Sequence, residues 1–320
     1  MEAISKIAGQ SIHLPLQFLL EFGSHGKFGV ICMQSFGMAC IYIDIKVKKY
    51  KRKKIMQKRH TDRKMYFHDL EVTSQEYYID YVSAYTKLTP ESSILEVGCG
   101  EGGNLAPFAR LGCRVTGVDI AECRIKDTKA YFSEISDTAT FACCDFMKCP
   151  VPNRDEDKYD VILLHDVIEH IPAKEPFLAH IKNFLKPTGV LFVGFPVWQM
   201  PFGGHQQICK NKFCSHLPFI HLLPNPLYKL LLKMCKESSG TIKELMSIKE
   251  CRTSIELFEH LIHKCGYSVT DQKLWFINPH YKQKFHLTPR LLPHWMWKLK
   301  YSRDFFTTSC WYVLSNQTKK

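Results

Sequence analysis

The fold of this chain is decided by the stretch Ile94-Leu95-Glu96-Val97-Gly98-Cys99-Gly100-Glu101-Gly102-Gly103-Asn104. An apolar run ends in an acid, and a cluster of glycines follows at once. Short apolar runs are typical of buried parallel strands, and ligands bind where such strands end. Glycines permit a tight turn there and let a ligand approach the backbone closely. The stretch therefore predicts a strand and a ligand-binding loop, with the Glu96 carboxylate suited to a ligand that carries a positive charge and hydroxyls.

A second strand-like run narrows the choice of ligand. Residues 113–119, CRVTGVD, end in Asp119, which lies twenty-one residues after Gly98. An acid about 20 residues beyond a glycine loop is placed to accept both hydroxyls of a ribose. Gly98, Gly100 and Gly103 also satisfy G-x-G-x-x-G, so the residues alone leave a nicotinamide or flavin site open as an alternative.

Strand-like and helix-like segments alternate along the chain, which implies right-handed crossovers and a parallel sheet. Thr73 with Glu76, and Thr253 with Glu256, form capping boxes that predict two helix starts, and the second helix should stop at Gly266. We therefore expect an α/β fold with a doubly wound, seven-stranded, mostly parallel sheet. The expected strands are 93–97, 114–118, 139–144, 159–164, 189–195, 267–276 and 308–315, and the helices between the first five are 103–111, 121–133 and 174–185.

Two stretches break this alternation. Residues 196–250 are rich in Pro, His, Leu and Lys, and residues 277–304 contain three prolines together with Trp295 and Trp297. Both follow strand ends, so we expect helical lid insertions that cover the site; the alternative is peripheral helices that pack an edge of the sheet. We divide the chain into an N-terminal extension, 1–64, and one domain, 65–320.

The positive charge of the chain is concentrated in one run. The formal net charge is +12, and residues 46–64 alone carry eleven Lys or Arg against one acid, which leaves only +2 for the rest. A single basic run is usually a solvated arm, although it can touch phosphate or anionic lipid. Because the remaining body is nearly neutral, its substrate need not be a polyanion, and we do not expect nucleic acid as a partner.

Neither a membrane anchor nor a disulfide framework is expected. Residues 28–43 carry no charge, but a helix of sixteen residues rises only ~24 Å, short of the ~30 Å hydrocarbon core. The fourteen cysteines lie within predicted strands and helices, without the spacing of a disulfide scaffold, and no signal-peptide pattern opens the chain. We therefore expect a cytoplasmic protein with reduced thiols.

Four segments, taken in order, carry a resemblance to a known family. They are ILEVGCGEGGN, VTGVDI, CCDFMKCP, and YDVILLHDVIEHI followed by FLKPTGVLFVGFP. Over roughly residues 66–315 the chain resembles the class I S-adenosylmethionine-dependent methyltransferases. The resemblance implies that Asp119 binds the ribose and that the loop with Asp145 reads the adenine amino group. It disfavours the oxidoreductase alternative, which has no reason to show Asp145 and the last two segments in this order.

The resemblance also implies S-adenosylmethionine as the cofactor. The residues that it assigns to cofactor binding are Glu96, Gly98, Cys99, Gly100, Asp119, Ile120, Asp145, Phe146 and His165. The segment Asp166, Glu169 and His170 is similar to that of ubiquinone-pathway O-methyltransferases, where an acid-acid-His cluster is implicated in magnesium binding. These residues stand at i, i+3 and i+4 and would share one helix face. We favour no metal, because Asp166 is one methylene shorter than the family's acid.

The acceptor is expected to be a small molecule that is methylated on oxygen. A hydroxyl must lose its proton, so a general base is needed, and His205, His170 and His165 are the candidates. Tyr77, Tyr81, Trp198 and Phe202 are expected around the acceptor. A zinc site made of His205, Cys209, Cys214 and His216 is a further alternative with unfavourable spacing.

Two alternative functions remain open. The first is an RNA methyltransferase that uses residues 46–64 as a phosphate-binding arm. The second is a non-catalytic protein that binds S-adenosylmethionine. Substrate identity cannot be predicted, because it is set by lid loops of individual sequence.

Overall fold

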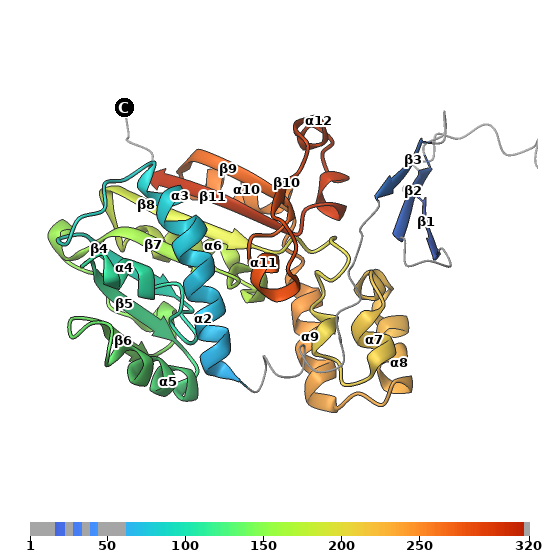
Figure 1. Ribbon diagram of the computed structural model, residues 1–320, viewed down its shortest axis with the longest axis horizontal. Coiled ribbons are helices and arrows are strands. Elements are labelled where there is room, and N and C mark those ends of the chain that lie inside the picture. Colours follow the sequence, from blue (N-terminus) through green and yellow to red (C-terminus); the bar gives the residue numbers. More distant parts are fainter. Residues whose placement is uncertain (1–16, 23–27, 34–38, 44–61, 317–320) are drawn as a thin grey trace, which may run out of the picture. The chain divides into compact units, whose positions relative to one another are not determined.

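The computed structural model describes residues 62–316, together with three strands that precede them (Figure 1). The chain forms two compact units, Met1–Lys58 and Arg59–Lys320. In the first unit, β1 (Gln17–Phe22), β2 (Phe28–Met33) and β3 (Ala39–Ile43) form an antiparallel sheet in the order β1-β2-β3. The uncharged segment 28–43, considered above as a short helix, thus contains two strands. Among the described residues, no helix combines the length and apolar character needed to cross a bilayer.

The second unit is built on an eight-stranded sheet with the order β10-β9-β11-β8-β7-β4-β5-β6. Strands β4 to β8 run parallel to one another, whereas β11 is antiparallel to both β8 and β9. The predicted doubly wound, mostly parallel sheet is confirmed, but it has one strand more than the seven expected. The strands are β4 (Ser93–Val97), β5 (Arg114–Asp119), β6 (Thr140–Cys143), β7 (Tyr159–His165), β8 (Leu185–Phe195), β9 (Tyr267–Ile277), β10 (Arg290–Leu291) and β11 (Ser309–Asn316).

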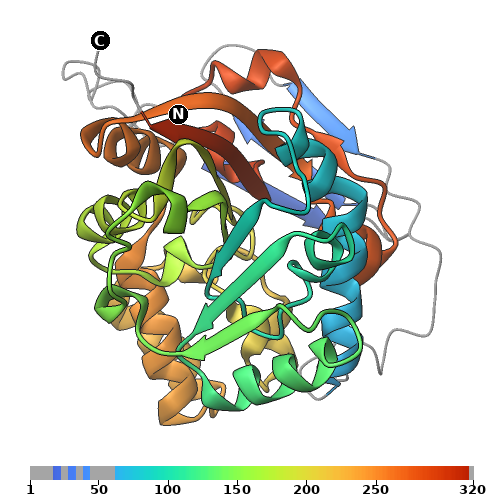
Figure 2. The same ribbon diagram turned by 90° about the vertical axis from the view of Figure 1, so that its left-hand side faces the viewer.

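Helices cover both faces of this sheet (Figures 1 and 2). Side chains of β7 alternate between two hydrophobic cores: Ile162 and Leu164 join one, and Val161 and Leu163 join the other. Burial on both faces explains why the central strands are continuous apolar runs. The first core is closed by α6 (Lys174–Lys182) and α10 (Ile255–Lys264), and the second by α2 (Arg63–Thr73), α3 (Ile79–Ser83), α4 (Ala106–Arg110) and α5 (Glu122–Phe132).

The first helix begins well before the capping box predicted at Thr73. Its N-cap is Asp62, whose side chain accepts a hydrogen bond from the Met65 N–H at 3.0 Å. Thr73 lies inside the helix and donates from its hydroxyl to the Asp69 carbonyl. The helix continues through a π-helical turn, η1 (Ser74–Tyr78), into α3. The prediction of a start at Thr73 was therefore wrong.

The second capping box is shifted by one residue. The N-cap of α10 is Ser254, which accepts from the Leu257 N–H at 3.1 Å, rather than Thr253, which is buried. The helix ends at Lys264, and Gly266 follows in a left-handed conformation with φ +71°. The predicted stop at this glycine agrees with the structure.

The two stretches that break the alternation fold as helical insertions. The segment between β8 and α10 holds α7 (Lys212–His216), α8 (Asn225–Met234) and α9 (Ser239–Cys251), with a small core of its own around Cys214, Tyr228, Leu232 and Leu245. The segment between β9 and β11 holds α11 (His280–Phe285), β10, α12 (His294–Trp297) and the 3₁₀ turn η7 (Arg303–Phe305). The remaining 3₁₀ turns are η2 (Phe146–Lys148), η3 (Asp155–Asp157), η4 (Ile168–His170), η5 (Gln206–Ile208) and η6 (Ile220–Leu222).

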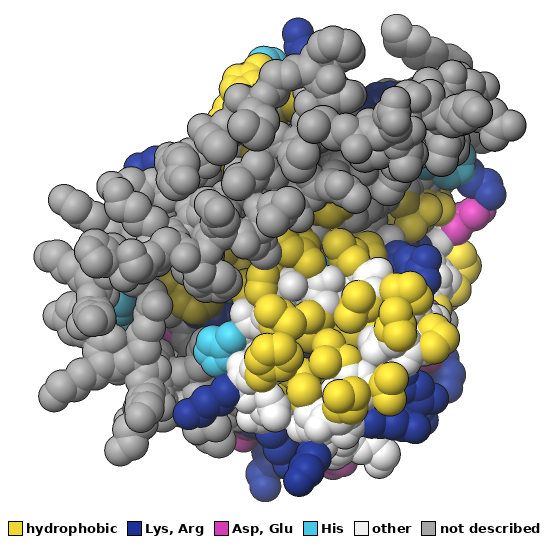
Figure 3. Space-filling model, turned by 90° about the vertical axis from the view of Figure 1, so that its right-hand side faces the viewer, with side chains coloured by type: hydrophobic (Ala, Val, Ile, Leu, Met, Phe, Trp, Pro, Cys, Tyr) yellow, Lys and Arg dark blue, Asp and Glu magenta, His cyan; other side chains and the backbone are white. Residues whose placement is uncertain are grey.

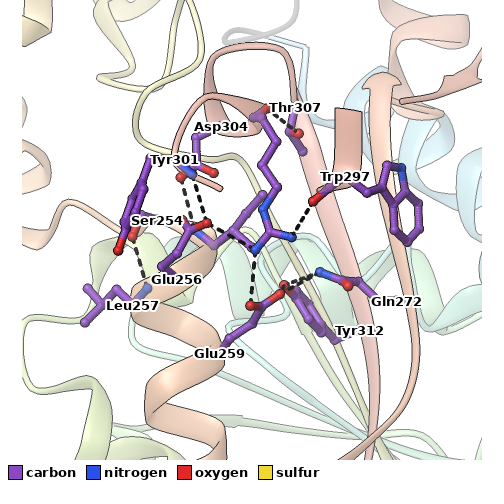
Figure 4. A network of polar contacts seen from close by, with 12 residues as sticks. Ser254, Glu256, Leu257, Glu259, Gln272, Trp297, Tyr301, Asp304, Thr307 and Tyr312 are labelled. Atoms are coloured by element: carbon purple, nitrogen blue, oxygen red, sulfur yellow. Dashed lines mark hydrogen bonds and ion pairs between the residues drawn. The ribbon is translucent and has the colours of Figure 1, made fainter. Parts of the chain in front are cut away.

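A buried polar network anchors the second insertion to the sheet (Figure 4). The Arg303 guanidinium pairs with Glu256 at 3.2 Å and with Glu259 at 3.1 Å, both on α10. The Tyr312 hydroxyl on β11 and the Gln272 amide on β9 also donate to Glu259. The network therefore joins η7, α10, β9 and β11 through one charged side chain that is only 8% exposed.

Candidate functional site

The glycine loop after β4 is held tightly against its neighbours. The N–H groups of Gly98 and Cys99 both donate to the Val118 carbonyl, at 2.7 and 3.1 Å. Gly98 has φ +73°, and a Cβ there would lie 2.4 Å from Cγ2 of Val167. Gly100 has φ +52°. Left-handed conformations and this close approach explain why glycine is required at the turn.

Gly103 brings helix α2 onto the same loop. A Cβ at this position would lie 2.3 Å from the Phe67 carbonyl oxygen and 2.7 Å from Cβ of Leu70, both on α2. The Ser74 hydroxyl donates to the Asn104 carbonyl at 2.7 Å and fixes the other end of the contact. The G-x-G-x-x-G match at Gly103 thus reflects helix packing.

Glu96 is a buried acid with one unsatisfied oxygen. Its side chain is 1% exposed; Oε1 accepts from the Asn104 amide at 2.7 Å, and Oε2 has no partner among the described residues. Burial raises the pKa of Glu96 to about 8, against the lowering effect of the Asn104 hydrogen bond. A cation or a donor placed beside Oε2 would favour the ionised form.

Asp119 ends β5 beside the loop and is oriented by two backbone donors. Its Oδ2 accepts from the Gly100 N–H and its Oδ1 from the Ala121 N–H, both at 2.8 Å. Each carboxylate oxygen can still accept a further hydrogen bond. Ile120 follows with its side chain 76% exposed, so it offers an apolar surface next to the acid. A ribose at Asp119 and a ring against Ile120 fit this arrangement.

The Asp145 loop places one side chain at the cap of a short turn and the next in the core. Asp145 caps η2 by accepting from the Met147 N–H at 3.1 Å. The Phe146 ring packs in the core against Phe177 and Phe184, so only its backbone is open to a ligand. The Cys99 side chain is likewise buried. Both side chains complete the core, so a cofactor could contact Cys99 and Phe146 through their backbone atoms, and their assignment to cofactor binding stays a prediction.

A second group of polar residues follows β7. Asp166 has φ +54° and stands outside the short η4 helix that carries Glu169 and His170, so the three do not share a helix face as predicted. Glu169 is 4% exposed, and neither of its carboxylate oxygens has a hydrogen-bond partner among the described residues. Nε2 of His170 and Nε2 of His205 each lie 3.9 Å from Glu169 Oε1. The third member of the cluster is therefore His205.

Protonation of this cluster is strongly biased by burial. Burial, with the Asp166 charge, raises the pKa of Glu169 well above its usual range. Burial lowers the pKa of His170, and it lowers that of His205 to about 3, with His170 and Lys284 as further causes. Burial therefore favours the protonated form of Glu169 and the neutral imidazole of His170 and His205. The backbone at His205 is in the left-handed conformation, with φ +57°, which a non-glycine residue adopts only at a cost in conformational energy.

Glu169, His170 and His205 are the only group of the described residues whose ligand atoms are gathered closely enough, within 4.8 Å, to hold a metal ion. Two imidazoles and one carboxylate do not suit magnesium, which prefers oxygen ligands. We therefore do not propose magnesium as a cofactor. Among the described residues, the ligand atoms of the alternative zinc site do not come together. Cys209 and Cys214 lie buried in the small core of the first insertion, whereas His216 is exposed.

The residues expected around the acceptor differ in how deeply they are buried. Tyr81 is buried between Phe192 and Trp311, in the core under the sheet, so we remove it from the acceptor set. Tyr77 is partly buried beside Trp275. Figure 1 shows the lid segments that bear the remaining candidates near the ends of β7 and β8.

Two of these residues lie on the loop that leads to His205. Trp198 is buried, and its ring packs edge-on against His221, 4.6 Å between centroids; it braces the loop. Phe202 is partly buried on the same loop. Of the pair, Phe202 remains available to an acceptor.

Two tyrosines near the cluster were missed by the sequence analysis. Tyr78 is fully buried against His165, 5.3 Å between ring centroids, and its hydroxyl has no partner among the described residues. Burial and the Asp166 charge raise the pKa of Tyr281, on α11, to about 12. The sequence signal for Tyr78 was only a run of two tyrosines, and none marked Tyr281, because the position of a lid helix is set by tertiary contacts.

Part of the second unit is similar to known proteins. Residues 95–191 match the family described as Methyltransferase domain. The structure aligns with the plantazolicin methyltransferase BpumL in complex with a pentazolic desmethylPZN analog and SAH, at a TM-score of 0.50 and 14% identity, over 82% of this chain and 90% of that one. Residues 95–191 thus match a methyltransferase domain, and the second unit shares the fold of a solved methyltransferase.

Curated relatives of the methyltransferase domain carry different acceptor names. A ubiquinone biosynthesis O-methyltransferase of Rickettsia akari is 28% identical over 120 residues, 37% of this chain and 46% of the relative. One of Maricaulis maris is 35% identical over 98 residues, 31% of this chain and 38% of the relative. A sterol 24-C-methyltransferase of Gibberella zeae is 30% identical over 116 residues, 35% of this chain and 30% of the relative. The matches thus span less than half the length of these relatives.

Proposed function

We propose that this methyltransferase domain transfers the methyl group of S-adenosylmethionine to a hydroxyl oxygen of a small molecule. The observation that carries the proposal is the pairing of two sites at the ends of neighbouring strands. Glu96, the glycine loop and Asp119 form a cofactor cradle, and Glu169, His170 and His205 form a proton-handling cluster. Val167, which packs on Gly98, joins the two.

The cradle binds the cofactor through complementary charge and hydrogen bonding. The two oxygens of Asp119 would accept hydrogen bonds from the ribose hydroxyls, and Ile120 would cover one face of the adenine. The Glu96 oxygen that has no partner among the described residues would suit the positively charged methionine end of the cofactor. Bound S-adenosylmethionine supplies an activated methyl group, and the protein holds the acceptor in line with it, so that proximity supplies most of the rate.

The acceptor hydroxyl must lose a proton as its oxygen attacks. His205 takes this proton on Nε2, and the Glu169 carboxylate, 3.9 Å away, stabilises the imidazolium that forms. While Glu169 is protonated, His205 is a weak base; the rate should therefore rise with pH as Glu169 ionises. A positioned base contributes about 10²–10⁴-fold.

A hydroxyl acceptor is supported by this base cluster and by the names of the O-methyltransferase relatives. One relative is named as a sterol 24-C-methyltransferase, so similarity of this extent does not by itself select oxygen as the acceptor atom. The choice of oxygen therefore depends on the histidine cluster.

The test uses the full chain, S-adenosylmethionine with a labelled methyl group, and a small-molecule extract. Wild type should label a compound, and Asp119→Ala should lose cofactor binding and labelling together. His205→Gln should keep cofactor affinity and lose labelling about 100-fold or more in kcat. Glu169→Gln should flatten the rise of kcat with pH.

Three outcomes would contradict the proposal. Cofactor binding by wild type without any labelled product would favour a non-catalytic binding protein. Labelling of RNA in preference to small molecules would favour the RNA alternative. Unchanged kcat in His205→Gln would exclude the assigned base.

A further inference from the structure

Helix α8 is apolar on two opposite sides. Tyr228 and Leu232, one turn apart, are completely buried in the core of the first insertion. Leu227 and Leu230 are each 53% exposed, and Met234 is 71% exposed. These three stand at i, i+3 and i+7 and therefore form a second stripe along the outer side of the helix. A helix that only packed on its own domain would need one apolar stripe.

Helix α7 lies beside the end of α8 and adds one exposed apolar side chain. Phe213 is 60% exposed, and the next residue, Cys214, contacts Cys235 just beyond Met234 by a side-chain hydrogen bond. We call Phe213, Leu227, Leu230 and Met234 the α7–α8 face. Figure 3 looks at the side of the molecule on which α7 and α8 lie, and hydrophobic side chains gather there with Lys and Arg along the rim. Gathered exposed apolar side chains with a polar rim mark an interaction surface.

The charged residues of the segment that carries the α7–α8 face all have the same sign. Residues 205–236 contain five lysines and no Asp or Glu. The first acid that follows, Glu237, is 8% exposed and turned inward, where it accepts from the N–H groups of Lys210 and Asn211. All five lysines are exposed: Lys210, Lys212, Lys229, Lys233 and Lys236.

We propose that the α7–α8 face docks on the surface of an anionic lipid bilayer. The apolar stripe enters the boundary between headgroups and acyl chains, and the lysines contact the anionic headgroups. A second copy of the chain fits less well, because two such faces would bring lysine rims together without acids to balance them. The ten residues of α8 rise only ~15 Å, so the helix lies along the surface and does not span.

This proposal differs from the sequence-based expectation of no membrane partner. That expectation rested on the segment 28–43, judged as a spanning helix. A surface-bound helix is recognised instead by an exposed apolar stripe flanked by basic residues. In α8 the leucines of the two stripes are adjacent in sequence, so the exposure that separates them is visible only in the folded chain.

The test measures partition of the full chain onto sedimenting vesicles, of phosphatidylcholine alone or with one third phosphatidylglycerol. Wild type should bind the anionic vesicles and not the neutral ones. The triple variant Leu227→Gln, Leu230→Gln, Met234→Gln keeps every charge and should lose about 100-fold in partition, since three side chains no longer enter the bilayer. Lys229→Glu with Lys233→Glu should lose about tenfold or more, with the loss shrinking at high salt.

Matched controls separate this face from other sources of binding. Leu111→Gln, Val269→Gln and Leu291→Gln replace three apolar side chains that are 48%, 49% and 47% exposed elsewhere, and together they should leave partition unchanged. Circular dichroism and the affinity for S-adenosylmethionine check that each variant is folded.

Several results would overturn the proposal. If the basic run 46–64 alone drove vesicle binding, the triple glutamine variant would bind as wild type does. Absence of wild-type binding to anionic vesicles would also refute it. A wild-type dimer in sedimentation velocity that the triple variant abolishes, without vesicle binding by either, would assign the face to a second copy of the chain.

Discussion

Replacing Glu96 with glutamine should change the stability of the cofactor-free protein in a pH-dependent way. Glu96 is 1% exposed, and burial raises its pKa from 4.5 to about 8. The native protein therefore holds this proton more tightly than the unfolded chain does. The stabilisation is fully present below pH 4.5 and is lost as the pH rises to about 8. Glutamine keeps the shape and one acceptor but has no proton to lose.

The size of the effect follows from the shift in pKa. Over the interval between the two values, wild type loses roughly 1.4 kcal/mol per pH unit through this residue. From about pH 5.5 to about pH 7.5, the free energy of unfolding of Glu96→Gln should therefore rise by about 2–3 kcal/mol relative to wild type. Urea unfolding followed by circular dichroism, without cofactor, measures the difference at each pH. The control is Glu175→Gln, since Glu175 is a surface residue with 44% side-chain exposure, paired with Lys264.

Cofactor binding should favour the ionised form of Glu96, whereas burial in the cofactor-free protein favours the protonated form. A cation beside Oε2 of Glu96 favours the carboxylate, so the affinity of wild type for S-adenosylmethionine should rise with pH over the same range. The affinity of Glu96→Gln should be lower and independent of pH in calorimetric titration. A difference in unfolding free energy between variant and wild type that is the same at both pH values would refute the reasoning, because burial would then not be acting on ionisation.

Three further changes test the packing and the buried charges. Gly98→Ala should lower the free energy of unfolding by about 2–4 kcal/mol, because its Cβ would meet Val167 and its φ is positive. In a double-mutant cycle, Val167→Ala should recover the loss of stability that comes from the steric contact and leave the loss that comes from the backbone conformation. Arg303→Ala should cost about 2–3 kcal/mol in urea unfolding, since it removes the buried cation that pairs with Glu256 and Glu259, which are 16% and 35% exposed. An equal effect of the exposed Arg154→Ala would contradict this. Burial, with the charge of a neighbouring glutamate, raises the pKa of Asp304 to about 7. The free energy of unfolding of Asp304→Asn should therefore rise relative to that of wild type by roughly 1.4 kcal/mol per pH unit between about pH 4 and 7. A difference in unfolding free energy that does not change with pH would exclude this assignment.

The strands and the acids at their ends could be predicted because each has a local signal. Parallel strands buried on both faces are apolar runs bounded by glycines and acids, as in 93–97 and 113–119. Glu96 and Asp119 stand at strand ends, and the parallel sheet brings strand ends together. Local pattern and tertiary position coincide at these residues.

Elsewhere the local pattern was insufficient. Thr73 and Glu76 match a capping box by residue type, but the Thr73 hydroxyl bonds the Asp69 carbonyl inside a longer helix. Strand β10 has two residues and no periodicity to detect. Asp166 was placed on a helix face, and its positive φ turns it out of the helix.

The meeting of His205 with Glu169 depends on how the loop after β8 folds back. That path is set by contacts within the lid, such as the one between Trp198 and His221, and no spacing in the sequence encodes them. The same holds for Tyr281, which arrives from the other insertion.

The contact between Gly103 and helix α2 leaves no room for even one methyl group. Local unfolding of the glycine loop therefore requires that helix α2 move away from it, and the helix and the loop belong to one cooperative unfolding unit. Backbone amides in 63–73 and 98–104 should exchange their hydrogens at related rates, and any ligand that binds the loop should slow exchange in the helix by the same factor. A helix with no atom in the cofactor cradle then reports on its occupancy.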